Sequence, residues 1–227
     1  MICLKPMQQA LVIGASGGIG AAVALALEGQ GYAVTRLSRS ADGLDLTDEA
    51  SVQSRLERLD GHFTTVFVAT GALELGPYRP EKSLRAVDPA AFAAQFALNA
   101  TGPLLVLKHA LRLMPRDVPV RFAALSARVG SIGDNHLGGW YGYRAAKAAL
   151  NQLIHTAAIE VARSHPQSVV VSLHPGTVDT DLTRAHRGSH LAMQPAEAAA
   201  HLLAVLEGLT PAQTGGFYDW QGKSVPW

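Results

Sequence analysis

The sequence predicts a single α/β domain, in which helices cover both faces of a doubly wound parallel sheet. Short apolar runs of strand-forming residues alternate with longer Ala- and Leu-rich runs at helical spacing. The expected strands are apolar on both faces, which is typical of parallel sheets buried between two layers of helices. With 227 residues, the chain has the length of one large domain with a complete core.

The expected elements follow a repeated strand–helix order. Strands are expected over 9–14, 32–38, 64–70, 120–126 and 168–176, with a short one in 43–46 and a last one in 215–220. Helices are expected over 17–30, 47–59, 89–114, 139–163 and 195–207. Thr47 is placed to cap the second helix with its hydroxyl, and Pro89 and Pro195 suit a first helical turn. This order favours the doubly wound arrangement.

Composition excludes several classes of protein. The net charge is +1 and no run of five like charges occurs, so the basic footprint of a nucleic-acid binder is missing. The single cysteine, Cys3, rules out an internal disulfide and a cysteine zinc cluster, which favours a cytoplasmic setting. No stretch reaches 18 uninterrupted apolar residues, so we expect a soluble protein with small-molecule partners and no membrane span.

A glycine-rich segment lies between the first expected strand and helix. Gly14, Gly18 and Gly20 permit a tight turn there, and they let a pyrophosphate approach backbone N–H groups at the positive end of the helix. The alternative is a glycine-rich turn with only a folding role. The flanking strand and helix favour a dinucleotide-binding loop.

The end of the second strand selects between cofactors. An acidic residue at this point binds a free 2′-hydroxyl of the adenosine ribose, whereas an arginine neutralises a 2′-phosphate. Ser38 and Arg39 stand here, so we expect NADP(H) rather than NAD(H). The alternative for Arg39 is a solvated surface residue. Asp45 follows and is expected to accept a hydrogen bond from the adenine amino group.

The segment "WYGYRAAK" contains Tyr143 and Lys147 four positions apart, so a helix places them on one face, whereas Tyr141 points elsewhere. Taken alone, the pair would be read as a tyrosine packed beneath a lysine stem. The alternative is a working pair. An ammonium within about 4–6 Å lowers the pKa of a phenol, which then suits proton transfer to a carbonyl oxygen.

Five motifs in order resemble the short-chain dehydrogenase/reductase family over nearly the whole chain. They are the glycine pattern, "DLTD" at 45–48, "NATG" at 99–102, "YRAAK" at 143–147 and "HPGTVDTDL" at 174–182. Residues 130–151 and the ending 219–227 look more narrowly like the branch that contains the cell-to-cell signalling C-factor and the sniffer-type carbonyl reductases. The resemblance implies a Rossmann-type fold and NADP(H)-dependent hydride transfer to a carbonyl.

The resemblance also implies roles for further residues. Lys147 would hold the nicotinamide ribose, and Asn99 would order a proton-relay water, although alone it would be read as structural. The Val178 backbone and the Thr180 hydroxyl would contact the nicotinamide carboxamide. The other expected cofactor-binding residues are Ser16, Ile19, Leu46, Gly71, Tyr143, Pro175 and Gly176, of which Pro175 and Gly176 are alternatively plain turn residues.

The sequence departs from the family at the catalytic serine, because the expected pair of serines reads Ser126 then Ala127. Either Ser131, which we favour, or Ser126 turned inward is expected to polarise the substrate carbonyl. The "NNAG" of the family is replaced by "VATG" at 68–71, which keeps only the glycine.

The segment between "DTDL" and Pro195 is too short to enclose a large ligand, so we expect an open site for small carbonyls. His136, Trp140 and Tyr141 are candidates for the pocket wall, or for core packing. His186 and His190 have metal-ligand spacing but lack a nearby carboxylate, so no metal site is expected.

Two functions follow from these motifs. The leading one is an NADPH-dependent reductase of small carbonyls, with Tyr143 as proton donor and Lys147 lowering its pKa. The alternative is a dinucleotide-binding regulator or cell–cell signalling protein with little or no turnover, motivated by Ala127 and the C-factor resemblance. Members of the family often pair through the helices around Asn99 and Tyr143, as a homodimer or homotetramer, but monomers also occur and the sequence does not choose between these states.

Overall fold

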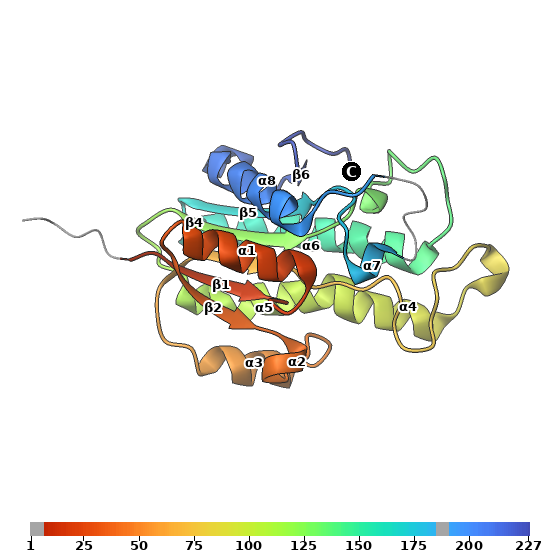
Figure 1. Ribbon diagram of the computed structural model, residues 1–227, viewed down its shortest axis with the longest axis horizontal. Coiled ribbons are helices and arrows are strands. Elements are labelled where there is room, and N and C mark those ends of the chain that lie inside the picture. The colour runs from red at the N-terminus through yellow and green to blue at the C-terminus, as the bar shows by residue number, and fades with distance from the viewer. Residues whose placement is uncertain (1–6, 185–190) are drawn as a thin grey trace, which may run out of the picture.

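The computed structural model describes residues 7–184 and 191–227, which form one six-stranded parallel sheet in the order β2-β1-β3-β4-β5-β6 (Figure 1). The strands are β1 (Gln9–Ile13), β2 (Ala33–Leu37), β3 (Phe63–Val68), β4 (Val120–Leu125), β5 (Ser168–His174) and β6 (Phe217–Asp219). Because the chain runs from β1 to β2 on one side and then to β3 on the other, the order reverses at β1 and β3. Ligands of such sheets bind at the carboxyl ends of the strands flanking this reversal.

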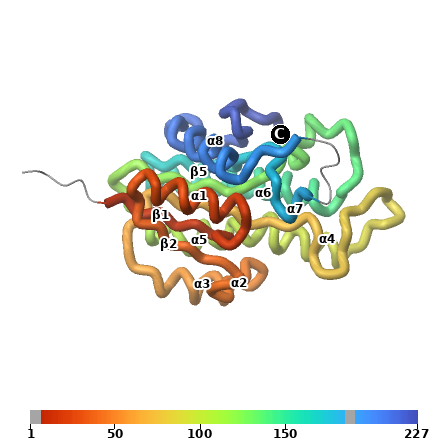
Figure 2. Tube along the Cα trace, in the orientation of Figure 1, coloured from red at the N-terminus to blue at the C-terminus, as the bar shows by residue number. Residues whose placement is uncertain are grey.

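Helices cover both faces of the sheet, as predicted. One face packs against α1 (Gly18–Gly29) and α8 (Pro195–Gly208), which lie side by side in Figures 1 and 2. On the other face lie α3 (Glu49–Glu57), α5 (Gly102–Ala110) and α6 (Tyr141–Ser164). Helix α4 (Pro89–Phe96) packs against α6. Alternate residues of one strand enter the two cores, with Leu11 and Ile13 on the α6 face and Ala10 and Val12 on the other.

Helices α4 and α5 are joined by a π-helical turn, Ala97–Thr101, which carries Asn99. Within the described residues, Pro89–Leu113 is the one stretch long and apolar enough to cross a membrane by length and composition. Residues of α5 in this stretch belong to the core beside α3 and α6. Burial against the sheet therefore accounts for its apolar character.

Two details differ from the sequence-based expectations. No strand forms at 43–46. Leu44 and Leu46 enter the core from an irregular segment, and the Asp45 N–H donates to Ser51 Oγ instead of to a strand. Thr47 does not cap α3 either, because its hydroxyl donates to Asp45 Oδ1, while Asp48 accepts the Ala50 N–H as the cap.

The short helices complete the chain. They are α2 (Arg39–Asp42), α7 (Asp181–Arg184) and the 3-10 turns Leu84–Ala86, Leu111–Leu113, Arg128–Gly130 and Pro211–Gln213. Of these, α2, α7 and Arg128–Gly130 follow the carboxyl ends of β2, β5 and β4. These segments, which carry several of the expected site residues, therefore lie at the carboxyl ends of the strands.

Candidate active site

The glycine-rich loop after β1 has a shape that only small residues permit. Gly14 has a φ of +82°, and a Cβ atom there would lie 2.9 Å from Thr70 Cγ2. A Cβ atom at Gly20 would collide with the carbonyl oxygen of Gly14. Gly17 caps α1 without a side chain, so the first N–H groups of the helix face the loop. Ser16 is exposed here and Ile19 packs on the core.

Ser38 and Arg39 follow β2, and their side chains differ in burial and contacts. The buried Ser38 caps α2 through its hydroxyl, which accepts the Ala41 N–H at 3.2 Å. Arg39 is exposed. Hydrogen bonds from the Thr47 side chain and backbone hold the pKa of Asp45 below its usual value, and the Arg39 charge adds to this. The Leu46 side chain is buried in the core, and its cofactor-binding role stays a prediction.

Gly71, after β3, lies where two other expected site residues meet. Its φ is +155°, and a Cβ atom there would lie 3.0 Å from Asn99 Oδ1 and 3.3 Å from Lys147 Nζ. These three residues come from separate elements: the segment after β3, the π-helical turn and α6. The structure therefore brings them together, and the space between them admits no side chain at Gly71.

Asn99 is fully buried and its side chain is committed to local contacts. Its Oδ1 accepts the Ala72 N–H at 3.1 Å, and its Nδ2 donates to Ala72 O at 2.9 Å and to Gln95 Oε1 at 2.6 Å. The side chain thus fixes the segment after β3 against the π-helical turn. Such turns interrupt the regular helical hydrogen bonds and often occur at functional sites. The water-ordering role of Asn99 stays a prediction.

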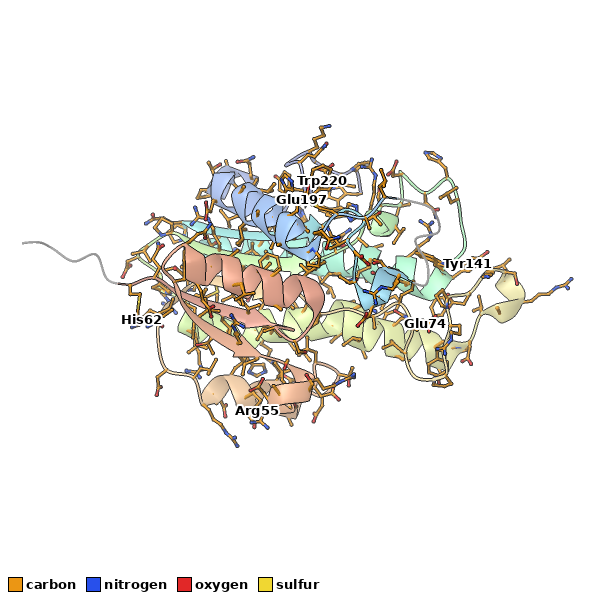
Figure 3. The ribbon with its side chains drawn as sticks, viewed as in Figure 1. Arg55, His62, Glu74, Tyr141, Glu197 and Trp220 are labelled. Carbon is orange, nitrogen blue, oxygen red and sulfur yellow. The ribbon has the colours of Figure 1, made fainter. Side chains whose placement is uncertain are left out.

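Tyr143 and Lys147 share one face of α6, as their spacing predicts. Lys147 Nζ lies 5.8 Å from the centroid of the Tyr143 ring and donates to Leu125 O, at the end of β4, over 2.9 Å. Both side chains are buried, with exposures of 8% for Tyr143 and 2% for Lys147. Tyr141 is the first residue of α6 and lies at the end of the molecule away from His62 (Figure 3).

The pKa values of Tyr143 and Lys147 differ from the sequence-based expectation. Burial raises the pKa of Tyr143 to about 12. Burial also lowers the pKa of Lys147 to about 7. The expected lowering of the Tyr143 pKa by Lys147 is therefore wrong for this structure. The physical reason is that low-polarity surroundings disfavour both charged forms, and Lys147 points at a backbone carbonyl rather than at the phenol.

Both candidate serines are buried beside α6. Ser126 Oγ has no hydrogen-bond partner among the described residues, and Ser126 follows β4 on the face that packs against α6. Ser131 Oγ accepts the Asp134 N–H at 3.1 Å. The turn between the two serines packs tightly on α6, since a Cβ atom at Gly130 would lie 2.8 Å from Lys147 Cβ. The choice between the two hydroxyls stays open.

The turn after β5 reaches the glycine-rich loop. Gly176 has a φ of +78°, and a Cβ atom there would lie 2.9 Å from Trp220 Cδ1. Val178 is buried, and its carbonyl accepts a hydrogen bond from the Thr183 hydroxyl. Thr180 Cγ2 lies 3.0 Å from the position of a Cβ atom at Gly18. The turn that begins at Pro175 and the loop after β1 therefore face each other.

Some expected residues lie elsewhere. His136 is exposed, whereas Trp140 and Tyr141 are half-buried. His186 and His190 lie outside the described residues. Within the described ranges 7–184 and 191–227, no group of three or more His, Cys, Asp or Glu side chains is placed to hold a metal ion.

Comparison with known proteins decides the family. The family model described as enoyl-(acyl carrier protein) reductase matches residues 14–212. The chain belongs to the short-chain dehydrogenase/reductase family. The predicted resemblance is thereby confirmed, and so is the Rossmann-type sheet.

Three members of this family show how similar the chain is to known proteins. It is 37% identical to C-signal of Myxococcus xanthus over 62% of this chain and 81% of the relative. It is 30% identical to 1-hydroxy-2-glutathionyl-2-methyl-3-butene dehydrogenase of Rhodococcus over 97% of this chain and 100% of the relative. A short-chain dehydrogenase/reductase from Burkholderia multivorans with bound NADP has a TM-score of 0.79 at 25% identity, over 98% of this chain and 100% of that one.

Within this family fold, several side chains that shape the site carry no motif of their own. Gln95 holds Asn99, and Arg144 donates to Gly139 O at 3.0 Å and to Val129 O at 3.4 Å, which joins both ends of the loop that carries Ser131. Glu81 contacts the start of α6. Gln95 and Asn99 are four positions apart on one helical run, a spacing that could have indicated their contact. Spacing gives no signal for the Glu81 contact, because it joins segments 61 positions apart.

Proposed function

We propose that the protein is an NADP(H)-dependent carbonyl reductase or alcohol dehydrogenase that transfers a hydride between nicotinamide and a small carbonyl or alcohol substrate. The observation that carries the proposal is the convergence of Gly71, Asn99 and Lys147 next to Tyr143. Gly71 follows β3, and Lys147 contacts Leu125 O at the end of β4, so the cluster lies close to the reversal point of the sheet. The glycine-rich loop occupies the adjacent strand end.

The residues at these strand ends fit a dinucleotide. The loop after β1 has no space for a side chain at Gly14 or Gly20, and it presents the start of α1, which suits a pyrophosphate. Arg39 is exposed where a 2′-phosphate would lie, and neither Leu37 nor Ser38 offers a carboxylate to a free ribose hydroxyl. The related protein from Burkholderia multivorans binds NADP. These features support NADP(H) as the cofactor.

At the other end of the cofactor, Lys147, which lies beside Gly71, would hold the nicotinamide ribose. Val178 and Thr180 would contact the carboxamide, from a turn that lies against the loop at Gly18. The cofactor, when bound, supplies the hydride. The chain itself has to bind the carbonyl, exclude water and provide the proton.

Tyr143 provides this proton in the direction of reduction. Its raised pKa, about 12, keeps the phenol protonated at neutral pH. Transfer of the proton to the substrate oxygen leaves a phenolate on α6, and Lys147 Nζ lies 5.8 Å from the centroid of that ring. Because burial lowers the pKa of Lys147 to about 7, that lysine changes its charge close to neutrality. Ser131 or Ser126 would donate a hydrogen bond to the same substrate oxygen.

We further propose that the site accepts small or exposed carbonyls, because the chain between α7 and α8 is short. A cytoplasmic homodimer or homotetramer, paired through the helices around Asn99 and Tyr143, is proposed by analogy with the family. Analytical ultracentrifugation of the full chain tests the oligomeric state.

The experiment that tests the activity is NADPH oxidation with a panel of small aldehydes, diketones and quinones. The proposal expects turnover of at least one class by the wild type and strongly reduced turnover by Tyr143→Phe. If the wild type binds NADPH but turns over nothing above background, the reductase proposal fails.

That outcome would favour the second candidate, a dinucleotide-binding regulator or cell–cell signalling protein. The observations in its favour are the 37% identity to C-signal and the alanine at position 127, where the family commonly has a serine. A regulator that only binds a dinucleotide has no chemical need for Tyr143, Lys147 and Asn99 together.

A further inference from the structure

Glu81 is a carboxylate buried beside the catalytic helix. It lies between β3 and α4 and is only 5% exposed, which is unusual for a charged side chain. Its Oε2 accepts the Gly142 N–H at 3.1 Å, and its backbone oxygen accepts the Trp140 N–H at 2.6 Å. A residue some sixty positions away in the chain thus contacts the start of α6 twice.

Helix α6 needs this contact because its own cap supplies no acceptor. The capping residue is Trp140, whose φ is +52° and whose side chain makes no capping hydrogen bond. The first N–H groups of a helix lack partners within the helix, and the positive end of the helix dipole favours a negative charge. Glu81 therefore takes the place of the serine, threonine or aspartate that normally caps a helix.

The absence of a side chain at Gly142 allows the Glu81 carboxylate to approach the helix closely. A Cβ atom at Gly142 would lie 2.9 Å from Glu81 Oε1, and 3.4 Å from Gln95 Cγ. A glycine inside a helix is unfavourable, so its presence in the first turn requires a reason. Close approach of the Glu81 carboxylate supplies that reason.

Gln95 connects this first turn of α6 to Asn99. Gln95 lies beside Gly142, and its amide oxygen accepts from Asn99 Nδ2 while its amide nitrogen donates to Leu73 O at 2.9 Å. Tyr143 directly follows Gly142, and its ring meets the Trp140 ring edge-on at 6.4 Å. A shift of the first turn of α6 therefore moves Tyr143 relative to Asn99.

We propose that Glu81 is a positioning residue, which caps α6 from outside the helix and thereby fixes the Tyr143 hydroxyl against the substrate oxygen. The inference rests on the proposed function for its kinetic consequence, but the cap itself does not. It predicts that the carboxylate acts as a hydrogen-bond acceptor, so a glutamine at position 81 replaces it and an alanine does not.

The kinetic test compares Glu81→Ala and Glu81→Gln with the control Lys82→Ala, which changes the exposed neighbouring residue. We expect Glu81→Ala to lower kcat by about 10-fold or more, because small misplacements of reacting groups are costly. We expect NADPH affinity, measured by fluorescence titration, to stay within about threefold of wild type, since the cap does not touch the dinucleotide loop. Glu81→Gln should restore most of kcat. The proposal is overturned if Glu81→Ala keeps kcat within twofold of wild type, or if Glu81→Gln is as impaired as Glu81→Ala.

A second measurement needs no turnover and separates this inference from the proposed function. In a double-mutant cycle followed by urea unfolding, Gly142→Ala should lower the unfolding midpoint in the wild type, where its Cβ displaces the carboxylate that accepts the Gly142 N–H. In the Glu81→Ala background the same substitution should be neutral or stabilising, because the space is vacated and alanine favours a helix. Equal effects of Gly142→Ala in both backgrounds would refute the matched contact, whether or not the protein reduces a carbonyl.

Discussion

Replacing Gly71 by alanine tests whether the space between Asn99 and Lys147 belongs to the working site. The φ of +155° is one that L-residues rarely adopt, and holding an alanine there costs about 1–3 kcal/mol of unfolding free energy. The new Cβ atom would also lie 3.0 Å from Asn99 Oδ1, so Asn99 or Lys147 has to move by a few tenths of an ångström. Since a displacement of about 1 Å costs about 100-fold in rate, we expect kcat to fall by about 10-fold.

The assay combines urea unfolding with NADPH oxidation, and Gly31→Ala is the matched control. Gly31 also has a positive φ, +88°, but a Cβ atom there meets nothing within 4 Å. This control should lose about 1 kcal/mol of stability with an unchanged kcat. Wild-type kcat in Gly71→Ala, or an equal loss of kcat in Gly31→Ala, would refute the reasoning.

Three further predictions concern charge, cofactor choice and the serine. Burial lowers the pKa of Lys147 to about 7, while the unfolded chain keeps that proton up to about pH 10. Between these pH values the unfolded state binds more protons than the folded state. The unfolding free energy of wild type, measured in urea titrations, should therefore rise relative to that of Lys147→Met from pH 7 to pH 10. A difference in unfolding free energy that stays constant with pH would contradict the lowered pKa of Lys147. Arg39→Ala should weaken NADPH binding by about 10-fold and leave NADH binding unchanged in fluorescence titrations. Equal losses of affinity for both cofactors would contradict a contact between Arg39 and the 2′-phosphate. Ser131→Ala should lower kcat by about 100-fold, with Ser126→Ala close to wild type, and the reverse order would assign the carbonyl to Ser126.

The fold was predictable because its main signal is local. Continuous apolar runs marked the five longer strands, and helical spacing marked the long helices between them. The error at 43–46 has a physical cause. Leu44 and Leu46 are buried with the alternation of a strand, but the segment reaches the core without pairing to β2 or any other strand. Alternation reports burial and does not by itself report strand pairing.

The site was predictable only in part. Spacing placed Tyr143 and Lys147 on one face of α6, and the glycine pattern marked the loop after β1. The pKa of Tyr143 was expected in the wrong direction, because the dominant cause is burial, which depends on the whole fold. Glu81 and Gly142 were missed as a pair for a related reason, since their contact joins segments some sixty positions apart.

The most direct test of the account is the ratio of kcat between wild type and Tyr143→Phe at saturating NADPH, with any carbonyl that the wild type reduces. The phenylalanine keeps the buried ring and removes only the proton donor. We predict that kcat falls by at least about 100-fold, as for loss of a general acid, with the dissociation constant of NADPH within about threefold of wild type. Turnover by Tyr143→Phe at the wild-type rate would contradict the central claim that Tyr143 donates the proton.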